Sequence, residues 1–304
     1  MAYSCSVVQD DARGGLAKVV LAKGDGSESR VEIYLFGATV TSWISSGVER
    51  LFVSDKAVWN GEKAIRGGIP LVFPQFGQPD TTLAQHGFAR TSLWDWSCSC
   101  GESESGKVVF TLKDSAVTQR VWPHAFQLLY TVELTPASLR CQLLVRNPEG
   151  SAGSFPCQAL LHTYVRLPHE ISDLNVLGFQ GHRYVDKMAA GEVHEETREI
   201  VTIDCETDRI YLSSSTVEIP DLTLLSKGAP FMTVAKKAFM EDVQPLAADV
   251  VFWNAWVDKS ASLPDLGEGA YKSYVCVEPG VVSDRVEVPA GAALTLETTL
   301  TVLS

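Results

Sequence analysis

The stretch FQLLYTVELTPASLRCQLLVRN, residues 126–147, decides the fold class. In its first part, apolar residues alternate with mostly polar ones, and the apolar face carries Phe126, Leu128, Tyr130, Val132 and Leu134. The segment LRCQLLVRN repeats this alternation, and TPAS between the two parts has the composition of a turn. Because side chains of a strand alternate between its faces, the stretch predicts an antiparallel β-hairpin.

The same period of two returns along the chain. AALTLETTLTVL (292–303) alternates leucine and valine with threonine and glutamate. Further strands are predicted at VEIYLFGATVTSWI (31–44), KVVFTLKD (107–114), REIVTI (198–203), RIYLSS (209–214), DVVFWNAW (249–256) and YKSYVCVE (271–278). No amphipathic helix longer than about three turns is visible. Many short strands separated by Gly, Pro, Asn, Asp and Ser predict an all-β fold, with antiparallel sheets packed as a sandwich or barrel. Since no low-complexity linker or repeat interrupts them, we expect one domain over residues 1–304.

Composition narrows the classes of partner. The formal charge of −12 disfavours nucleic acid and anionic membranes, because phosphate backbones favour clustered Lys and Arg. No apolar run approaches the ~20 residues of a membrane helix, so no membrane span is predicted. The N-terminal sequence also lacks the pattern of a secretory signal. A small anionic substrate remains compatible with these features, since a few arginines can bind an anion locally.

The seven cysteines include no CxxC pair. This spacing argues against a zinc site and a disulfide framework, and it favours the reducing cytosol. Cys98 and Cys100 could form a ligand or redox pair, but their spacing beside Trp94 and Trp96 favours a strand.

Two irregular stretches carry candidate anion-binding residues. IRGGIPLVFPQFG (65–77) contains two prolines, which exclude an ordinary helix or central strand, so we predict a shaped loop that presents Arg66. QHGFAR (85–90) brings Gln85, His86 and Arg90 close together around a glycine. Two guanidinium groups on such loops can converge on one phosphate. The alternative is that each arginine only ties its own loop to backbone carbonyls.

Three further residues are candidates for proton transfer or binding. His162 in QALLHTYVRL has a strand-like apolar context, where a histidine is either a core residue or an acid–base group. Glu278 is predicted to end a strand, stopped by Pro279 and Gly280, where it could be a general base or an edge charge facing water. Asp208, just before the predicted strand 209–214, would by itself be part of a turn.

Six motifs occur in an order that resembles the glucose-6-phosphate 1-epimerases, the hexose-6-phosphate mutarotase branch of the aldose 1-epimerase family. In chain order they are IRGGIPLVFPQFG, QHGFAR, LLHTYV, TDRIY, VVFWNAW and VCVEPG. The resemblance extends from about Glu32 to the C-terminus. It implies a large antiparallel β-sandwich of the galactose-mutarotase type. It also implies interconversion of the α and β anomers of a hexose 6-phosphate, with glucose 6-phosphate as the expected substrate.

The resemblance also implies roles for individual residues. His162 matches the catalytic acid and Glu278 the catalytic base, on opposite sides of the anomeric centre. The matched substrate-contacting positions are Arg66, Gln85, Arg90 and Asp208, and His86 lies beside them. The implied reaction needs neither metal nor organic cofactor. Residues 181–199 match no familiar motif, and nothing is transferred to them.

Two other functions remain open. The chain could be a mutarotase for unphosphorylated aldoses, although two guanidinium groups would then lack an anion. It could also be a non-catalytic sugar-binding protein, which retention of both His162 and Glu278 disfavours. Trp253 and Trp256 could stack on a sugar or belong to the core. The expected partner is a small sugar phosphate, and we expect a monomer.

Overall fold

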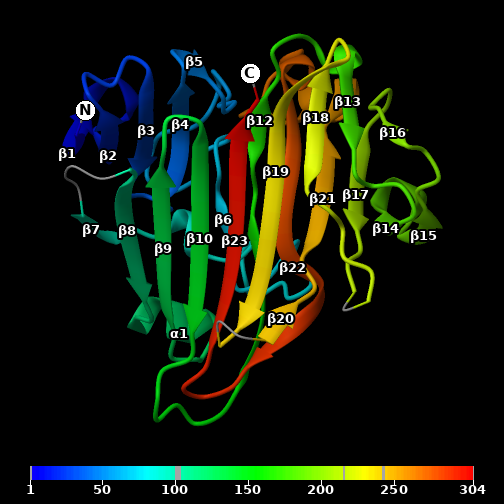
Figure 1. The fold of residues 1–304 in the computed structure, drawn as a ribbon. Coiled ribbons are helices and arrows are strands. Elements are labelled where there is room, and N and C mark those ends of the chain that lie inside the picture. The colour runs from blue at the N-terminus through cyan, green and yellow to red at the C-terminus, as the bar shows by residue number, and fades with distance from the viewer. Residues whose placement is uncertain (1, 100–103, 215, 242–243, 304) are drawn as a thin grey trace.

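The computed structural model describes residues 2–99, 104–214, 216–241 and 244–303 of the chain. Two large sheets lie one behind the other, and a smaller N-terminal sheet stands beside them (Figure 1). Neighbouring strands of these sheets pair antiparallel, as in the ladders β9–β10, β10–β23 and β21–β22. Within the described ranges, no helix is long and apolar enough to cross a membrane.

The ten-stranded sheet follows the order β16-β13-β18-β19-β23-β10-β9-β8-β7, with β20 paired to β19. Its strands are β16 (Ile200–Val201), β13 (Leu174–Leu177), β18 (Leu222–Ser226), β19 (Ala229–Met240), β23 (Ala293–Val302), β10 (Ser138–Arg146), β9 (Gln127–Leu134), β8 (Gly106–Lys113), β7 (Asp95–Ser99) and β20 (Gln244–Leu246).

The eight-stranded sheet follows the order β15-β14-β17-β21-β22-β11-β6, with β12 paired to β22. Its strands are β15 (Glu192–Glu195), β14 (Arg183–Asp186), β17 (Thr207–Tyr211), β21 (Asp249–Asn254), β22 (Tyr274–Val288), β11 (Phe155–Leu161), β6 (Leu71–Val72) and β12 (Tyr164–Arg166).

The N-terminal sheet has five strands in sequence order, and helices are short. The strands are β1 (Tyr3–Asp10), β2 (Leu16–Lys23), β3 (Ser29–Tyr34), β4 (Thr39–Ser45) and β5 (Val48–Glu49). The α-helices are α1 (Ala116–Val121) and α2 (Trp256–Ser262). The 3₁₀ turns are η1 (Asp11–Arg13), η2 (Ala89–Thr91), η3 (Ile171–Asp173), η4 (Lys187–Ala189) and η5 (Ala270–Ser273).

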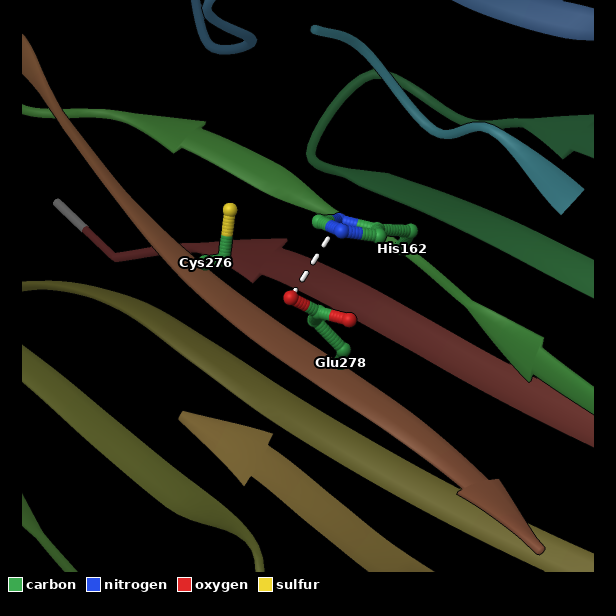
Figure 2. Close-up of side chains that lie close together, drawn as sticks. All are labelled: His162, Cys276 and Glu278. Atoms are coloured by element: carbon green, nitrogen blue, oxygen red, sulfur yellow. Dashed lines mark ion pairs between the residues drawn. The ribbon is translucent and has the colours of Figure 1, made fainter. Parts of the chain in front are cut away.

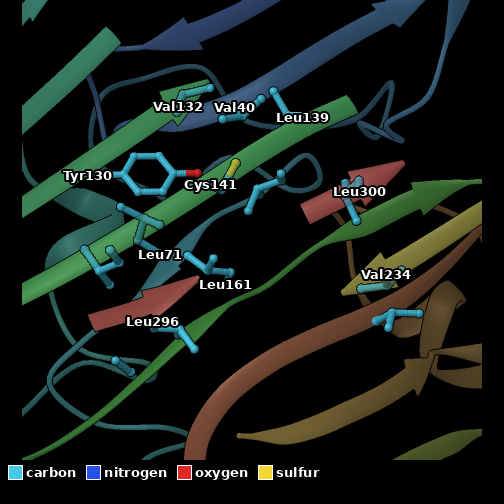
Figure 3. Packing of buried hydrophobic residues seen from close by; sticks show 14 of the residues in the cluster. Val40, Leu71, Tyr130, Val132, Leu139, Cys141, Leu161, Val234, Leu296 and Leu300 are labelled. Atoms are coloured by element: carbon cyan, nitrogen blue, oxygen red, sulfur yellow. The ribbon is translucent and has the colours of Figure 1, made fainter. Parts of the chain in front are cut away.

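The predicted hairpin of residues 126–147 is confirmed as β9 and β10. Leu134 lies opposite Leu139, and Tyr130 lies opposite Leu143. Burial alternates along both strands with the period of two that the sequence predicted. The buried face of this hairpin packs on residues of the eight-stranded sheet, among them Leu71 and Leu161 (Figure 3). The core therefore lies between the two large sheets, as in a β-sandwich.

Several predicted strands have different bounds. Residues 31–44 form two strands, β3 and β4, separated by a turn at Gly37. Only Ile200–Val201 of the stretch 198–203 is a strand, and residues 271–273 belong to η5. Cys98 lies in β7 as predicted, whereas Cys100 lies outside the described residues.

The prediction that Glu278 ends a strand is wrong, because β22 continues through Pro279 to Val288. On one side of β22, pairing with β12 stops at Cys276, and pairing with β11 begins at Gly280. Proline lacks an N–H group, so it is tolerated where a ladder is interrupted. This gap in the ladder is also the place where β11 ends and β12 has not yet begun.

The prediction of a turn at Asp208 is also wrong, since this residue lies inside β17 opposite Trp253 of β21. Aspartate has a low intrinsic preference for strands, but pairing with a buried neighbouring strand overrides such preferences. In contrast, residues 65–77 are irregular apart from the two-residue edge strand β6, which confirms the predicted loop.

Candidate active site

The seven residues predicted to be catalytic or to contact substrate all line one cavity of about 270 Å³. They are Arg66, Gln85, His86, Arg90, His162, Asp208 and Glu278. The other lining residues are Phe76, Gly77, Lys187, Val251, Trp253, Lys259 and Leu263. Loops and strands far apart in the sequence therefore converge at the gap in the β22 ladder.

His162 and Glu278 meet across this gap (Figure 2). His162 follows directly after β11 and is 8% exposed. Glu278 lies on β22 and is 1% exposed. His162 Nδ1 lies 3.2 Å from Glu278 Oε1. The two groups are not aligned as a hydrogen bond, and His162 Nδ1 and Glu278 Oε2 have no hydrogen-bond partner among the described residues. Each group therefore has an atom that is free to donate or accept a proton.

The ring of His162 is held in a fixed orientation. It stacks on Tyr164 at a centroid distance of 4.8 Å and an interplanar angle of 9°. The indole of Trp253 meets it edge to face at 6.0 Å. The backbone N–H of His162 donates to the carbonyl of Pro70 at 3.0 Å. Since Trp253 lines the cavity and contacts this ring, it is a wall of the site, whereas Trp256 packs on Tyr271 and is absent from the lining.

Burial and nearby charges shift the pKa values of the pair in opposite directions. Burial, followed by the charge of Asp208, raises the pKa of Glu278 well above its ordinary value. Burial, followed by His86 and Arg90, lowers the pKa of His162 well below its ordinary value. Both shifts disfavour the charged forms, so the carboxylate is a stronger base and the imidazolium a stronger acid than in water.

Two buried side chains hold the guanidinium of Arg66 in place. Its guanidinium donates from Nη1 to Tyr164 Oη and from Nη2 to Asp265 Oδ2, each at 3.3 Å. Asp265 is 2% exposed and also binds Lys63 Nζ at 2.9 Å. Gly68 lets the loop pass close to β4, because a Cβ atom there would lie 1.9 Å from the carbonyl oxygen of Val40.

Arg90 differs from Arg66 in having no ion-pair partner within the described part of the chain. Its Nη2 donates to the carbonyl of Gln85 at 2.7 Å. Burial lowers the pKa of Arg90 to about 10, and Arg66 acts in the same direction. Arg90 therefore stays charged at neutral pH, and an anion in the cavity could neutralise its guanidinium group.

His86 completes the wall beside Arg90. Its Nδ1 accepts a hydrogen bond from the backbone N–H of Gly77 at 3.1 Å, which in the neutral ring places the proton on Nε2. Its ring meets His162 edge to face at 5.8 Å. Burial and the charge of Arg90 lower the pKa of His86 well below its ordinary value.

Two lysines that line the cavity were not predicted from the sequence. Lys187 Nζ pairs with Asp208 Oδ1 at 3.2 Å and lies 4.3 Å from the ring centroid of Phe76. It belongs to η4, inside the unassigned segment 181–199. Lys259 projects from α2 and has no ion-pair partner among the described residues. No local pattern marks either lysine, because only the packing of distant loops brings them to the cavity.

One group of side chains near the cavity could hold a metal ion. The ligand atoms of His162, Cys276 and Glu278 all lie within 4.8 Å of one another, and all three residues are buried. Among the described residues, no other group of three or more His, Cys, Asp or Glu side chains meets this spacing.

Comparison with known proteins agrees with this geometry. The sequence profile of the aldose 1-epimerase family matches residues 19–301. Proteins of Cenchrus ciliaris and Escherichia coli, both named "Putative glucose-6-phosphate 1-epimerase", are 33% and 29% identical to this chain. Each alignment covers 91% of this chain, with 82% of the Cenchrus protein and 88% of the Escherichia protein.

Solved structures show the same fold. A protein of Salmonella typhimurium, described as a "putative mutarotase", superposes with a TM-score of 0.80 and 25% identity, over 99% of this chain and 94% of that one. The galactose 1-epimerase of Lactobacillus acidophilus gives a TM-score of 0.68 at 15% identity, over 99% of each chain. The galactose-mutarotase type of β-sandwich is thereby confirmed, and the chain belongs to the aldose 1-epimerase family.

Proposed function

We propose that this protein interconverts the α and β anomers of a hexose 6-phosphate, with glucose 6-phosphate as the favoured substrate. The observation that carries the proposal is the contact between His162 and Glu278 in a cavity that also presents Arg90. Membership of the aldose 1-epimerase family and the names of the relatives support the reaction type.

The pair supplies the base and the acid of ring opening. Glu278 removes the proton from the C1 hydroxyl while His162, in its protonated form, gives its proton to the ring oxygen. The C1–O5 bond breaks and the aldehyde forms. Both reacting oxygens are bonded to C1, so an acid and a base 3.2 Å apart can reach one oxygen each. We propose that both groups approach the anomeric centre from one side, whereas the resemblance implied opposite sides.

Ring closure reverses the roles. Rotation about C1–C2 presents the other face of the carbonyl to the C5 hydroxyl. His162 then accepts the hydroxyl proton while protonated Glu278 returns a proton to the carbonyl oxygen. The pair starts and ends the cycle with one proton, and the pKa shifts make Glu278 a stronger base and protonated His162 a stronger acid than in water.

The charges around the cavity favour a phosphorylated substrate. Four cations line it, of which Arg66 is paired with Asp265 and Lys187 with Asp208. Arg90 and Lys259 form no ion pair within the described ranges. A phosphate monoester carries about −1.5 to −2 charges at neutral pH, close to what these two cations can neutralise. We therefore propose that Arg90 and Lys259 bind the phosphate, with Arg66 beside them.

The remaining assignments follow the same proposal. Gln85, His86 and Asp208 face the same cavity and are proposed to contact sugar hydroxyls or the phosphate. We further propose a cytosolic monomer that needs no metal or cofactor and binds neither nucleic acid nor membranes. The free thiols of Cys98, Cys141, Cys157, Cys205 and Cys276 support a reducing compartment.

An anomer-resolved assay tests the proposed function. Freshly dissolved α-glucose 6-phosphate and α-glucose are each mixed with the protein, and equilibration is followed by polarimetry. We expect strong acceleration for the phosphorylated sugar and weak acceleration for glucose. Equal acceleration would favour a mutarotase for unphosphorylated aldoses, and acceleration of neither, with binding retained, would favour a sugar-binding protein.

A further inference from the structure

We propose that His162, Cys276 and Glu278 form a binding site for a thiophilic divalent cation such as Zn²⁺, and that the bound ion inhibits the enzyme. Cys276 and Glu278 lie two residues apart on β22, so their side chains point to the same face of the strand. His162 approaches from the end of β11 (Figure 2). One nitrogen, one sulfur and one oxygen donor therefore converge from two rigid elements.

The spacing of these donors is close to that of a zinc site. Usual metal–ligand distances place the donors of a tetrahedral zinc site roughly 3.4–3.6 Å apart. His162 and Glu278 already lie 3.2 Å apart, and the thiol lies within 4.8 Å of both. A side-chain shift on the order of 1 Å would bring the sulfur into place. The S–H proton leaves to solvent as the Zn–S bond forms, and the fourth position stays open for water.

A second observation supports a ligand at this point. His162 Nδ1 and Glu278 Oε2 are buried and have no hydrogen-bond partner among the described residues. Buried polar atoms normally find partners, so two unpartnered atoms on neighbouring buried side chains indicate a place for a ligand. Both residues line the cavity, which gives an ion its entry path.

The donor set also predicts which ions bind. Arg66, Arg90 and Lys187 line the same cavity and oppose any cation. Only an ion that gains strongly from sulfur and nitrogen ligands can overcome this repulsion. Zn²⁺, Cd²⁺ and Co²⁺ have that preference, whereas Mg²⁺ and Ca²⁺ prefer oxygen. Inhibition rests on the proposed function, because the ion would occupy the lone pairs that the acid–base pair uses. Binding itself does not depend on that proposal.

Co²⁺ binding and Zn²⁺ inhibition test the site separately. With wild-type protein, Co²⁺ should give the absorption band of a thiolate–cobalt bond. Cys276→Ser should lose this band and raise the Zn²⁺ concentration for half-inhibition on the order of tenfold or more. Cys205→Ser, which removes an exposed thiol, is the matched control and should behave as wild type. A strong chelator should restore activity, and Mg²⁺ should have no effect.

The outcomes separate the site from the function. A thiolate band that depends on Cys276, in a protein without anomerase activity, would support the site and refute the proposed function. An unchanged band and unchanged Zn²⁺ inhibition in Cys276→Ser would refute the site. Cys276→Ala is measured in parallel, and stabilisation of wild-type protein by Zn²⁺ against thermal unfolding provides a third readout if both variants fold poorly. Absence of both the band and this stabilisation would also refute the site.

Discussion

Replacing Arg90 by alanine should lower activity on phosphorylated sugars selectively. Arg90 lines the cavity and has no acidic partner within the described ranges, so its charge is available to a phosphate. A hydrogen bond to a charged group contributes about 1.5–3 kcal/mol. Since about 1.4 kcal/mol corresponds to a factor of ten, kcat/KM for glucose 6-phosphate should fall by roughly 10–150-fold. Activity on glucose should change little, because glucose presents no anion.

The assay compares both sugars in several variants. The rate of α-anomer equilibration is measured for glucose 6-phosphate and glucose, with the uncatalysed rate subtracted. Arg90→Lys should retain part of the selectivity, because a point charge remains without the planar fork. Lys259→Ala should give a smaller loss of the same kind, since this side chain is exposed. Arg66→Ala should lower both activities, because it also removes a partner of buried Asp265.

Equal loss on both sugars in folded Arg90→Ala would refute the reasoning. It would mean that Arg90 only braces its own loop through the carbonyl of Gln85. Selective loss in Arg66→Ala, with Arg90→Ala unaffected, would instead place the phosphate on Arg66.

Four further predictions concern the pair, its pH dependence, metals and stability. Glu278→Gln and His162→Ala should each slow anomerisation by roughly 10²–10⁴-fold while the circular dichroism of the fold is retained; near-full activity would remove that residue from the mechanism. As the pH falls, Glu278 takes up a proton and stops acting as a base. Because burial raises its pKa, the acid limb of the pH profile of kcat/KM should lie above the ordinary carboxyl pKa of 4.5. An acid limb at or below this value would contradict the burial of Glu278. Prolonged treatment with a strong chelator should leave activity intact, and a loss reversed by a divalent ion would reveal a required metal. Gly68→Ala should lower the free energy of unfolding by on the order of 2 kcal/mol or more, because the new Cβ atom would lie 1.9 Å from the carbonyl oxygen of Val40. An unchanged Tm in thermal unfolding would contradict this close approach.

The fold class and much of the site could be predicted from the sequence, because their signals are local. A period of two, as in the hairpin β9–β10, follows from the alternation of side chains along a strand and does not depend on distant contacts. The motif around Arg66 combines glycine and proline with a charged residue, and the motif around Arg90 contains a glycine, which marks each as a loop whatever it packs against. That residues 1–304 form one domain stays a prediction.

Only the tertiary structure decided how the chemistry is assembled. Glu278 is a mid-strand residue because the β22 ladder changes partner from β12 to β11 at that point, and such a change involves three distant segments. The same gap admits His162 and leaves its nitrogen beside the carboxylate. Long-range packing brings Lys187 to the cavity beside Asp208 and Asp265 to the guanidinium of Arg66, and these ion pairs determine which cations remain available to a substrate. Contacts between residues so far apart in the chain leave no local pattern, so the identity of the unpaired cations could be read only from the folded structure.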